Sequence, residues 1–134
     1  MAEVVVFHHA LGLTDWVRGL ADRLRDAGHT VHTPDLYDGR TFETIPDGMA
    51  YSEELGGPMA IVDGGRAAVE SLPGEVVYVG FSLGVLPAQS LAQTRPGARG
   101  AVLCYAALPL GRWGESRGPR RAGERARCRR VSRA

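Results

Sequence analysis

The chain has 134 residues, of which 44% are hydrophobic, and a formal net charge of +1. This length suits a single domain, and the apolar fraction suits a packed core, which excludes a wholly disordered chain. All sixteen basic residues are arginines. A GC-rich coding sequence explains that bias without a nucleic-acid partner.

The small net charge hides two unlike segments. Residues 1–111 carry seven arginines and thirteen carboxylates, a net charge of −6. Residues 112–134 carry nine arginines and two glutamates, a net charge of +7. We therefore divide the chain into a domain at 1–111 and an Arg-rich tail at 112–134. The tail keeps no hydrophobic period of 2 or 3.6, so we expect it to be disordered.

The start of the chain has no basic region followed by a long apolar run. We therefore expect neither a signal peptide nor a transmembrane helix, and no membrane partner. Cys104 and Cys128 have no metal-binding or redox spacing. The sequence as a whole implies no metal and no cofactor. Together these features indicate a cytoplasmic protein.

Residues 4–8 are an apolar run rich in β-branched side chains, which predicts a buried strand. Apolar residues at helical spacing then predict a helix up to residue 27, with Thr14 or Asp15 as its cap. The apolar residues of this helix are Trp16, Val17, Leu20, Ala21 and Leu24. A short strand is expected at 30–33, followed by an irregular stretch through Gly48. Two helical pieces are expected near 50–55 and 59–72.

The second half continues the alternation of strands and helices. We expect a strand at 75–80, a helix at 83–94 and a buried strand at 100–105. The order predicts an α/β fold with a parallel, doubly wound sheet of about four strands, flanked by helices. Because no further strand is recognisable, the strand at 100–105 is expected to leave an open apolar edge.

The run Gly80–Gly84 is a G-x-S-x-G motif placed directly between a predicted strand and a predicted helix. This context is typical of the nucleophile elbow of α/β hydrolases. We therefore expect Ser82 to be a catalytic nucleophile. The backbone N–H of Leu83, at the start of the helix, can donate to a developing oxyanion. The second oxyanion donor is expected from the loop after the first strand, where Ala10 N–H is the candidate.

Three blocks, Val4–Leu13, His32–Gly39 and Gly80–Gly84, resemble the dienelactone hydrolase family. The resemblance covers about residues 3–110 and implies an α/β-hydrolase fold that hydrolyses a small-molecule carboxylic ester or lactone. The best-known members carry cysteine where this chain has Ser82 and glutamate where it has His9. Serine at this position resembles a branch of the family that uses serine in place of the cysteine. The family also implies a general-base histidine, and an aspartate that orients it, after the elbow.

Those two partners have no counterpart after Ser82, where the sequence contains neither Asp nor His. The triad therefore cannot be completed in the family's order. His8 and His9, on the oxyanion loop, offer either a base for Ser82 or side chains that line the site. The alternative, which we favour, is that His8 bonds to the backbone and His9 shapes the loop.

Charge, hydrophobic pattern and triad are all lost together near residue 110. We interpret this as a truncated hydrolase whose reading frame shifts between residues 110 and 117, with impaired activity. One alternative is a non-catalytic remnant that folds and binds only. Another is a basic tail that binds nucleic acid, but the tail lacks interleaved aromatics or an amphipathic helix.

Overall fold

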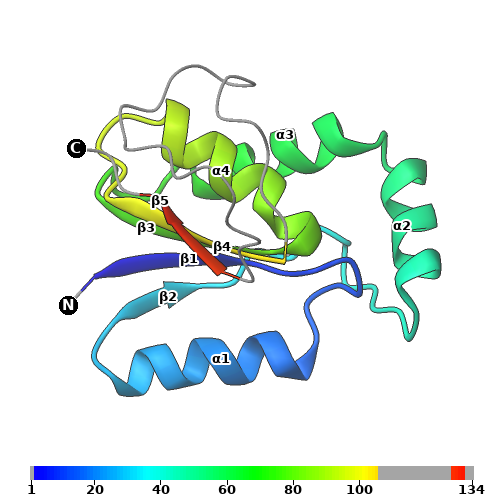
Figure 1. The fold of residues 1–134 in the computed structure, drawn as a ribbon, viewed down its shortest axis with the longest axis horizontal. Coiled ribbons are helices and arrows are strands. Elements are labelled where there is room, and N and C mark those ends of the chain that lie inside the picture. The colour runs from blue at the N-terminus through cyan, green and yellow to red at the C-terminus, as the bar shows by residue number, and fades with distance from the viewer. Residues whose placement is uncertain (1, 106–127, 132–134) are drawn as a thin grey trace.

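The computed structural model describes residues 2–105 and 128–131. In these residues five strands form one sheet in the order β2-β1-β3-β4-β5. The strands are β1 Glu3–Phe7, β2 Thr30–His32, β3 Val76–Phe81, β4 Gly100–Cys104 and β5 Cys128–Val131. The helices are α1 Asp15–Asp26, α2 Ile45–Glu54, α3 Pro58–Val69 and α4 Val85–Thr94, with a 3-10 turn, η1, at Ser82–Gly84 (Figure 1).

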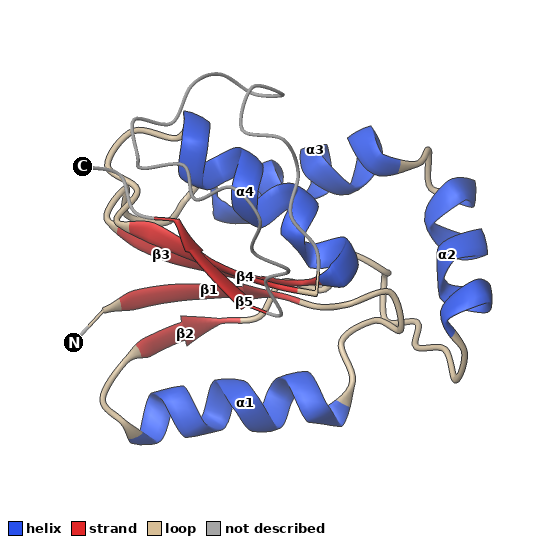
Figure 2. Cartoon of the chain, viewed as in Figure 1, coloured by secondary structure: helices blue, strands red, loops and turns tan. Residues whose placement is uncertain are grey.

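Strands β1 to β4 are parallel, which confirms the predicted sheet. β1 pairs with β2 and β3, and β3 pairs with β4, so that Phe81 lies opposite Cys104 at the carboxyl end. Helix α1 covers one face of the sheet, and α3 and α4 cover the other (Figure 2). The connections wind the chain around both faces, as the alternation of strands and helices predicted.

The first strand shows why its sequence is continuously apolar. Val4 and Val6 join a buried cluster with residues of α1. Val5 and Phe7 join the opposite cluster, which includes residues of α4. Because successive side chains of a strand point to opposite faces, a strand covered on both faces needs apolar residues at every position.

Helix α2 begins before the position that the sequence predicted. The stretch through Gly48 was expected to be irregular, whereas α2 starts at Ile45. The Thr44 side chain caps this helix by accepting a hydrogen bond from Asp47 N at 3.3 Å, and Pro46 occupies the first turn. Both are ordinary start signals for a helix. The start of α2 is hard to recognise from apolar periodicity, because the buried residues of this helix are Gly48 and Ser52.

The predicted disorder of the whole tail is wrong for Cys128–Val131, which form β5. The remainder of 112–134 lies outside the described residues. β5 runs antiparallel to β4 and pairs with Ala101–Cys104. The expectation of an open edge at β4 is therefore wrong. Edge pairing uses backbone N–H and C=O groups, which any non-proline sequence supplies. A strand can therefore form there without a hydrophobic period.

Arg95, which follows α4, ties together the ends of several elements. Its two terminal nitrogens donate to the carbonyls of Val69, Leu72 and Pro73 over 2.6–2.9 Å, and to the hydroxyl of Tyr78 at 3.1 Å. The three carbonyls follow α3 or end it, so the guanidinium takes the place of a C-terminal cap.

Replacing Arg95 by alanine is expected to lower the free energy of unfolding by about 3 kcal/mol, because charge-assisted hydrogen bonds are lost and carbonyls lose their donors. Urea denaturation measures this. Arg95→Lys should recover only part of the loss, since an ammonium lacks the planar fork. The control is Arg99→Ala, because Arg99 forms an exposed ion pair with Glu75 at 3.5 Å. A change within about 0.5 kcal/mol is expected there, and equal losses at both arginines would contradict the capping role.

Candidate active site

Ser82 lies at the carboxyl end of β3, on the turn of residues 80–84 that leads into α4; we call this the Ser82 turn. The serine is exposed and its φ is 51°. A positive φ is unfavourable for a residue with a side chain, and such strain concentrates at functional sites. Among the described residues, no group forms a hydrogen bond with the Ser82 hydroxyl. The hydroxyl is therefore accessible from solvent.

Two glycines make this turn possible. A Cβ added to Gly80 would overlap the carbonyl oxygen of Gly84 and lie 2.6 Å from its carbon. A Cβ added to Gly84 would overlap the carbonyl oxygen of Phe7 and lie 2.6 Å from that of His8. The first contact shows that the turn folds tightly on itself. The second shows that it presses against the end of β1.

The loop after β1 therefore comes next to the Ser82 turn. Ala10 of that loop and Leu83 of the turn share one buried cluster with Tyr37 and Ile61. The Leu83 N–H is among the first of its helical segment, where N–H groups have no intrahelical acceptor. The Ala10 N–H forms no hydrogen bond with any described backbone carbonyl. The two residues predicted as oxyanion donors are thus brought together.

Helix α2 holds this loop from the other side. A Cβ on Gly48 would overlap the carbonyl oxygen of Ala10, so α2 lies directly against the loop. The hydroxyl of Tyr37 donates to Gly48 O at 3.1 Å. Burial raises the pKa of Tyr37 to about 12, so this hydroxyl stays a donor at neutral pH. The position of Ala10 is fixed by packing on both sides.

His8 is fully buried, and both of its ring nitrogens bond to the backbone. Nδ1 lies 2.8 Å from His9 O, and Nε2 accepts the N–H of Leu36 at 2.9 Å. These bonds fix the neutral tautomer that carries its proton on Nδ1. The Asp35 carboxylate is 4.0 Å from Nε2 but accepts the N–H groups of Tyr37 and Gly39. His8 has no free nitrogen for Ser82.

Burial lowers the pKa of His8, and the bond to His9 and the charge of Asp35 only partly oppose this. Below pH 6.5, the ordinary value, the unfolded state binds more protons than the folded state. We therefore expect full stability above pH 6.5 and a fall in the urea midpoint as the pH drops toward the folded pKa.

The variant His8→Asn should start from a lower stability but show a shallower slope between pH 7 and pH 5. Burial also lowers the pKa of His9, so His9 and the carboxylates contribute to the pH dependence of stability in both proteins. The difference between the two slopes therefore isolates the contribution of His8. Equal slopes in the two proteins would show that His8 does not titrate with unfolding.

His9 is half-buried, and both of its ring nitrogens also have partners. Its Nδ1 accepts the N–H of Leu11 at 3.2 Å, and its Nε2 is 3.5 Å from the hydroxyl of Thr14. The ring lies against Trp16, with 5.8 Å between ring centroids. His9 therefore borders the loop and shapes it.

The other two histidines lie on or beside β2. His29 Nδ1 accepts the N–H of Ala2 at 3.1 Å, and His32 Nε2 is 2.8 Å from the Glu3 carboxylate. Both partners, Ala2 and Glu3, lie at the amino-terminal ends of the strands, whereas Ser82 lies at the carboxyl ends. In the described part of the chain, no cluster of histidine, cysteine or acidic side chains could hold a metal ion.

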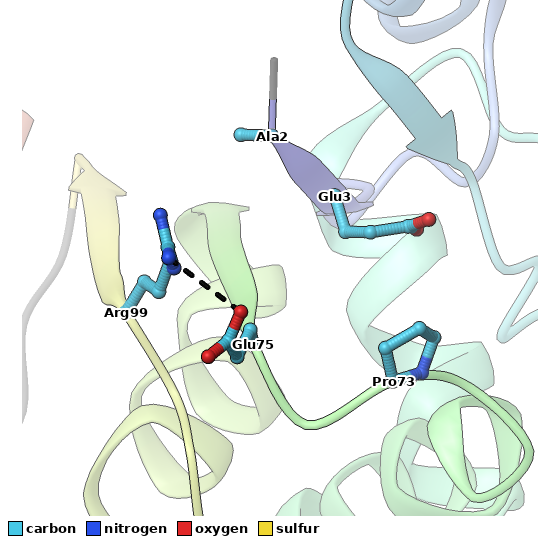
Figure 3. A pocket seen from close by; sticks show the side chains of 5 residues that line it. All are labelled: Ala2, Glu3, Pro73, Glu75 and Arg99. Atoms are coloured by element: carbon cyan, nitrogen blue, oxygen red, sulfur yellow. Dashed lines mark ion pairs between the residues drawn. The ribbon is translucent and has the colours of Figure 1, made fainter.

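A hollow of about 210 Å³ lies at these amino-terminal ends, where the strands begin (Figure 3). Ala2, Glu3, Pro73, Glu75 and Arg99 line it, and Arg99 pairs with Glu75 across it. It contains neither Ser82 nor the loop after β1, and we assign it no role in the site.

Trp16 lies differently from the sequence-based expectation. Trp16 was predicted to belong to the apolar face of α1, but its side chain is 55% exposed. Of that face, Val17 and Ala21 are fully buried. The Trp16 ring packs edge-on against Phe81, the residue before Ser82, at 5.0 Å. Its place beside the predicted loop after the first strand was the signal that could have assigned it to the site.

A parallel sheet wound on both faces, with an exposed serine between a strand and a helix, is the architecture of α/β hydrolases. The chain belongs to the dienelactone hydrolase family, whose sequence model matches residues 1–118. We found no significant match among curated proteins.

Solved structures share this fold. The protein named m3DLH has a TM-score of 0.62 and 28% identity, over 80% of this chain and 50% of its own. The promiscuous, dienelactone hydrolase-like phosphotriesterase P91 from metagenomic libraries has a TM-score of 0.56 and 24% identity, over 74% and 45%. A protein of Klebsiella pneumoniae named as a dienelactone hydrolase has a TM-score of 0.59 and 20% identity, over 75% and 46%. The chain thus spans about half the length of these structures. No helix in its described part has the length and apolarity to cross a bilayer.

Proposed function

We propose that this chain carries the nucleophile and the oxyanion hole of a hydrolase that acts on small-molecule carboxylic esters or lactones. Ser82 is the nucleophile, and the N–H groups of Leu83 and Ala10 stabilise the oxyanion. The observation that carries the proposal is the exposed Ser82 at φ 51°, on a turn pressed against the loop that contains Ala10. Family membership supports the reaction type.

The Ser82 hydroxyl attacks the carbonyl carbon, the carbonyl oxygen becomes an oxyanion between the two N–H groups, and the alkoxide then leaves. Water later hydrolyses the acyl-serine. A base must take the proton of Ser82 in the first attack and of water in the second, and the departing alkoxide and then Ser82 each take a proton back. A serine hydroxyl is a weak nucleophile without such a base. His8 and His9 both have their ring nitrogens engaged. The sequence supplies no Asp or His after Ser82. We therefore propose that turnover is strongly impaired.

Hydrolysis of p-nitrophenyl acetate by the full chain, compared with Ser82→Ala, tests the proposal. A rate above background that disappears in Ser82→Ala supports it. The same rate in both folded proteins would remove Ser82 as the nucleophile and leave a fold that binds only.

A further inference from the structure

The described residues expose two aromatic side chains, and both lie near the carboxyl ends of β3 and β4, where Ser82 follows β3. Trp16 is 55% exposed and Tyr105 is 68% exposed. Trp16 packs against Phe81, which precedes Ser82. Tyr105 follows Cys104, which lies opposite Phe81 in the β3–β4 pairing. Ser82 and Tyr105 are therefore the next residues of two paired strands.

Tyr105 also has a strained backbone. Its φ is 69°, and Ser82 and Asp38 are the other described non-glycine residues with a positive φ. A bulky residue in this region is an outlier, because its side chain crowds the backbone. Such strain is retained where a function requires it. Two neighbouring strands thus end in a strained, exposed residue, and one of the two is the proposed nucleophile.

Trp16 is held in place although it is exposed. The Phe81 ring meets it edge-on at 5.0 Å, and the His9 ring lies 5.8 Å away at an angle of 35°. Contacts on two sides limit the motion of the indole, while more than half of its surface stays open. A fixed, open aromatic face loses little entropy when a flat apolar group binds to it.

We propose that Trp16 and Tyr105 determine substrate specificity by binding the aromatic ring of an aryl ester beside Ser82. The inference rests on the proposed hydrolysis at Ser82 and names the class of ester. Aromatic rings attract one another beyond simple burial of area, whereas a saturated ring of equal size gains only the burial. The site should therefore prefer a phenyl ester to the matching cyclohexyl ester.

Binding of phenyl butyrate and cyclohexyl butyrate to the full chain, followed by NMR titration, tests this preference. Ser82→Ala serves as the background protein, so that no ester is consumed. Adding Trp16→Ala should weaken binding of both esters, because both lose burial against the indole, but it should weaken phenyl ester binding about three- to tenfold more than cyclohexyl ester binding. Trp16→Phe should retain most of the preference. Met59→Ala is the control, since Met59 is 53% exposed on α3, and it should change neither ligand.

Tyr105→Gly separates binding from a structural role. Glycine tolerates a φ of 69°, so this variant should keep or raise the melting temperature while it reduces the phenyl preference. A structural role would lower the melting temperature instead. The inference is overturned if both aromatic variants keep the full preference, or if Met59→Ala reduces it equally.

The proposed reaction at Ser82 and the proposed aryl specificity can fail independently of each other. Ser82-dependent hydrolysis without an aryl preference would reject only the specificity. A preference that depends on Trp16, without Ser82-dependent hydrolysis, would reject only the reaction.

Discussion

Imidazole added to the assay is expected to accelerate the hydrolysis of p-nitrophenyl acetate by this chain much more than by its Ser82→Ala variant. In serine hydrolases, loss of the general base alone costs a factor of about 10⁶ in turnover. If turnover is impaired as proposed, a free base beside Ser82 should restore part of this, and we expect a gain of about tenfold in the Ser82-dependent rate.

The structure favours rescue because Ser82 is exposed and no described group occupies its hydroxyl. A small base can therefore approach it. The gain should follow the neutral form of imidazole and rise with pH through its pKa, because only that form accepts a proton. A buried base within the chain would give a rate that imidazole leaves unchanged.

Imidazole also hydrolyses the ester by itself, so the informative quantity is the difference between the two proteins at each imidazole concentration. His8→Asn provides a second control. If His8 were the base, this variant would lose the rate measured without imidazole. Because its nitrogens bond to His9 O and Leu36 N, we expect that rate to be unchanged in the protein that stays folded. An equal acceleration of wild type and Ser82→Ala would contradict the proposal.

Much of the sheet could be predicted because its strands are short apolar runs buried on both faces. Val4–Phe7 and Val76–Phe81 carry this signal without ambiguity, and the helices between them set the parallel order. The start of α2 was missed because its signal is a cap, Thr44, and a proline, which are read only when a helix is already expected. β5 was missed because its pairing depends on the edge of β4.

The site was predictable to a different extent. The position of Ser82 and its closeness to Ala10 follow from the motif and the strand order. The engagement of His8 does not, because it depends on the backbone of Leu36, which is distant in sequence. The exposure of Trp16 likewise depends on which part of α1 extends beyond the sheet. Periodicity places a residue on a face of a helix but does not show where the covering sheet ends.

The second large effect is expected from Gly80→Ala, which should lower the free energy of unfolding by about 3 kcal/mol. The new methyl group would meet the carbonyl of Gly84 and lie 2.8 Å from Val85 N. These are backbone atoms, which cannot move aside as a flexible side chain would. The Ser82 turn must open to accommodate the methyl group, so Ser82-dependent hydrolysis should fall together with stability.

Gly19→Ala is the matched control, because it makes the same chemical change where nothing lies within 4 Å of the added methyl group. Gly19 is an exposed residue within α1. Alanine there should raise the free energy of unfolding by about 1 kcal/mol, since glycine weakens a helix interior. Urea denaturation of both variants should therefore move the midpoint in opposite directions. If Gly80→Ala were as stable as wild type and kept its Ser82-dependent rate, the turn would not need its close backbone contact, and the geometry on which the proposed nucleophile depends would be wrong.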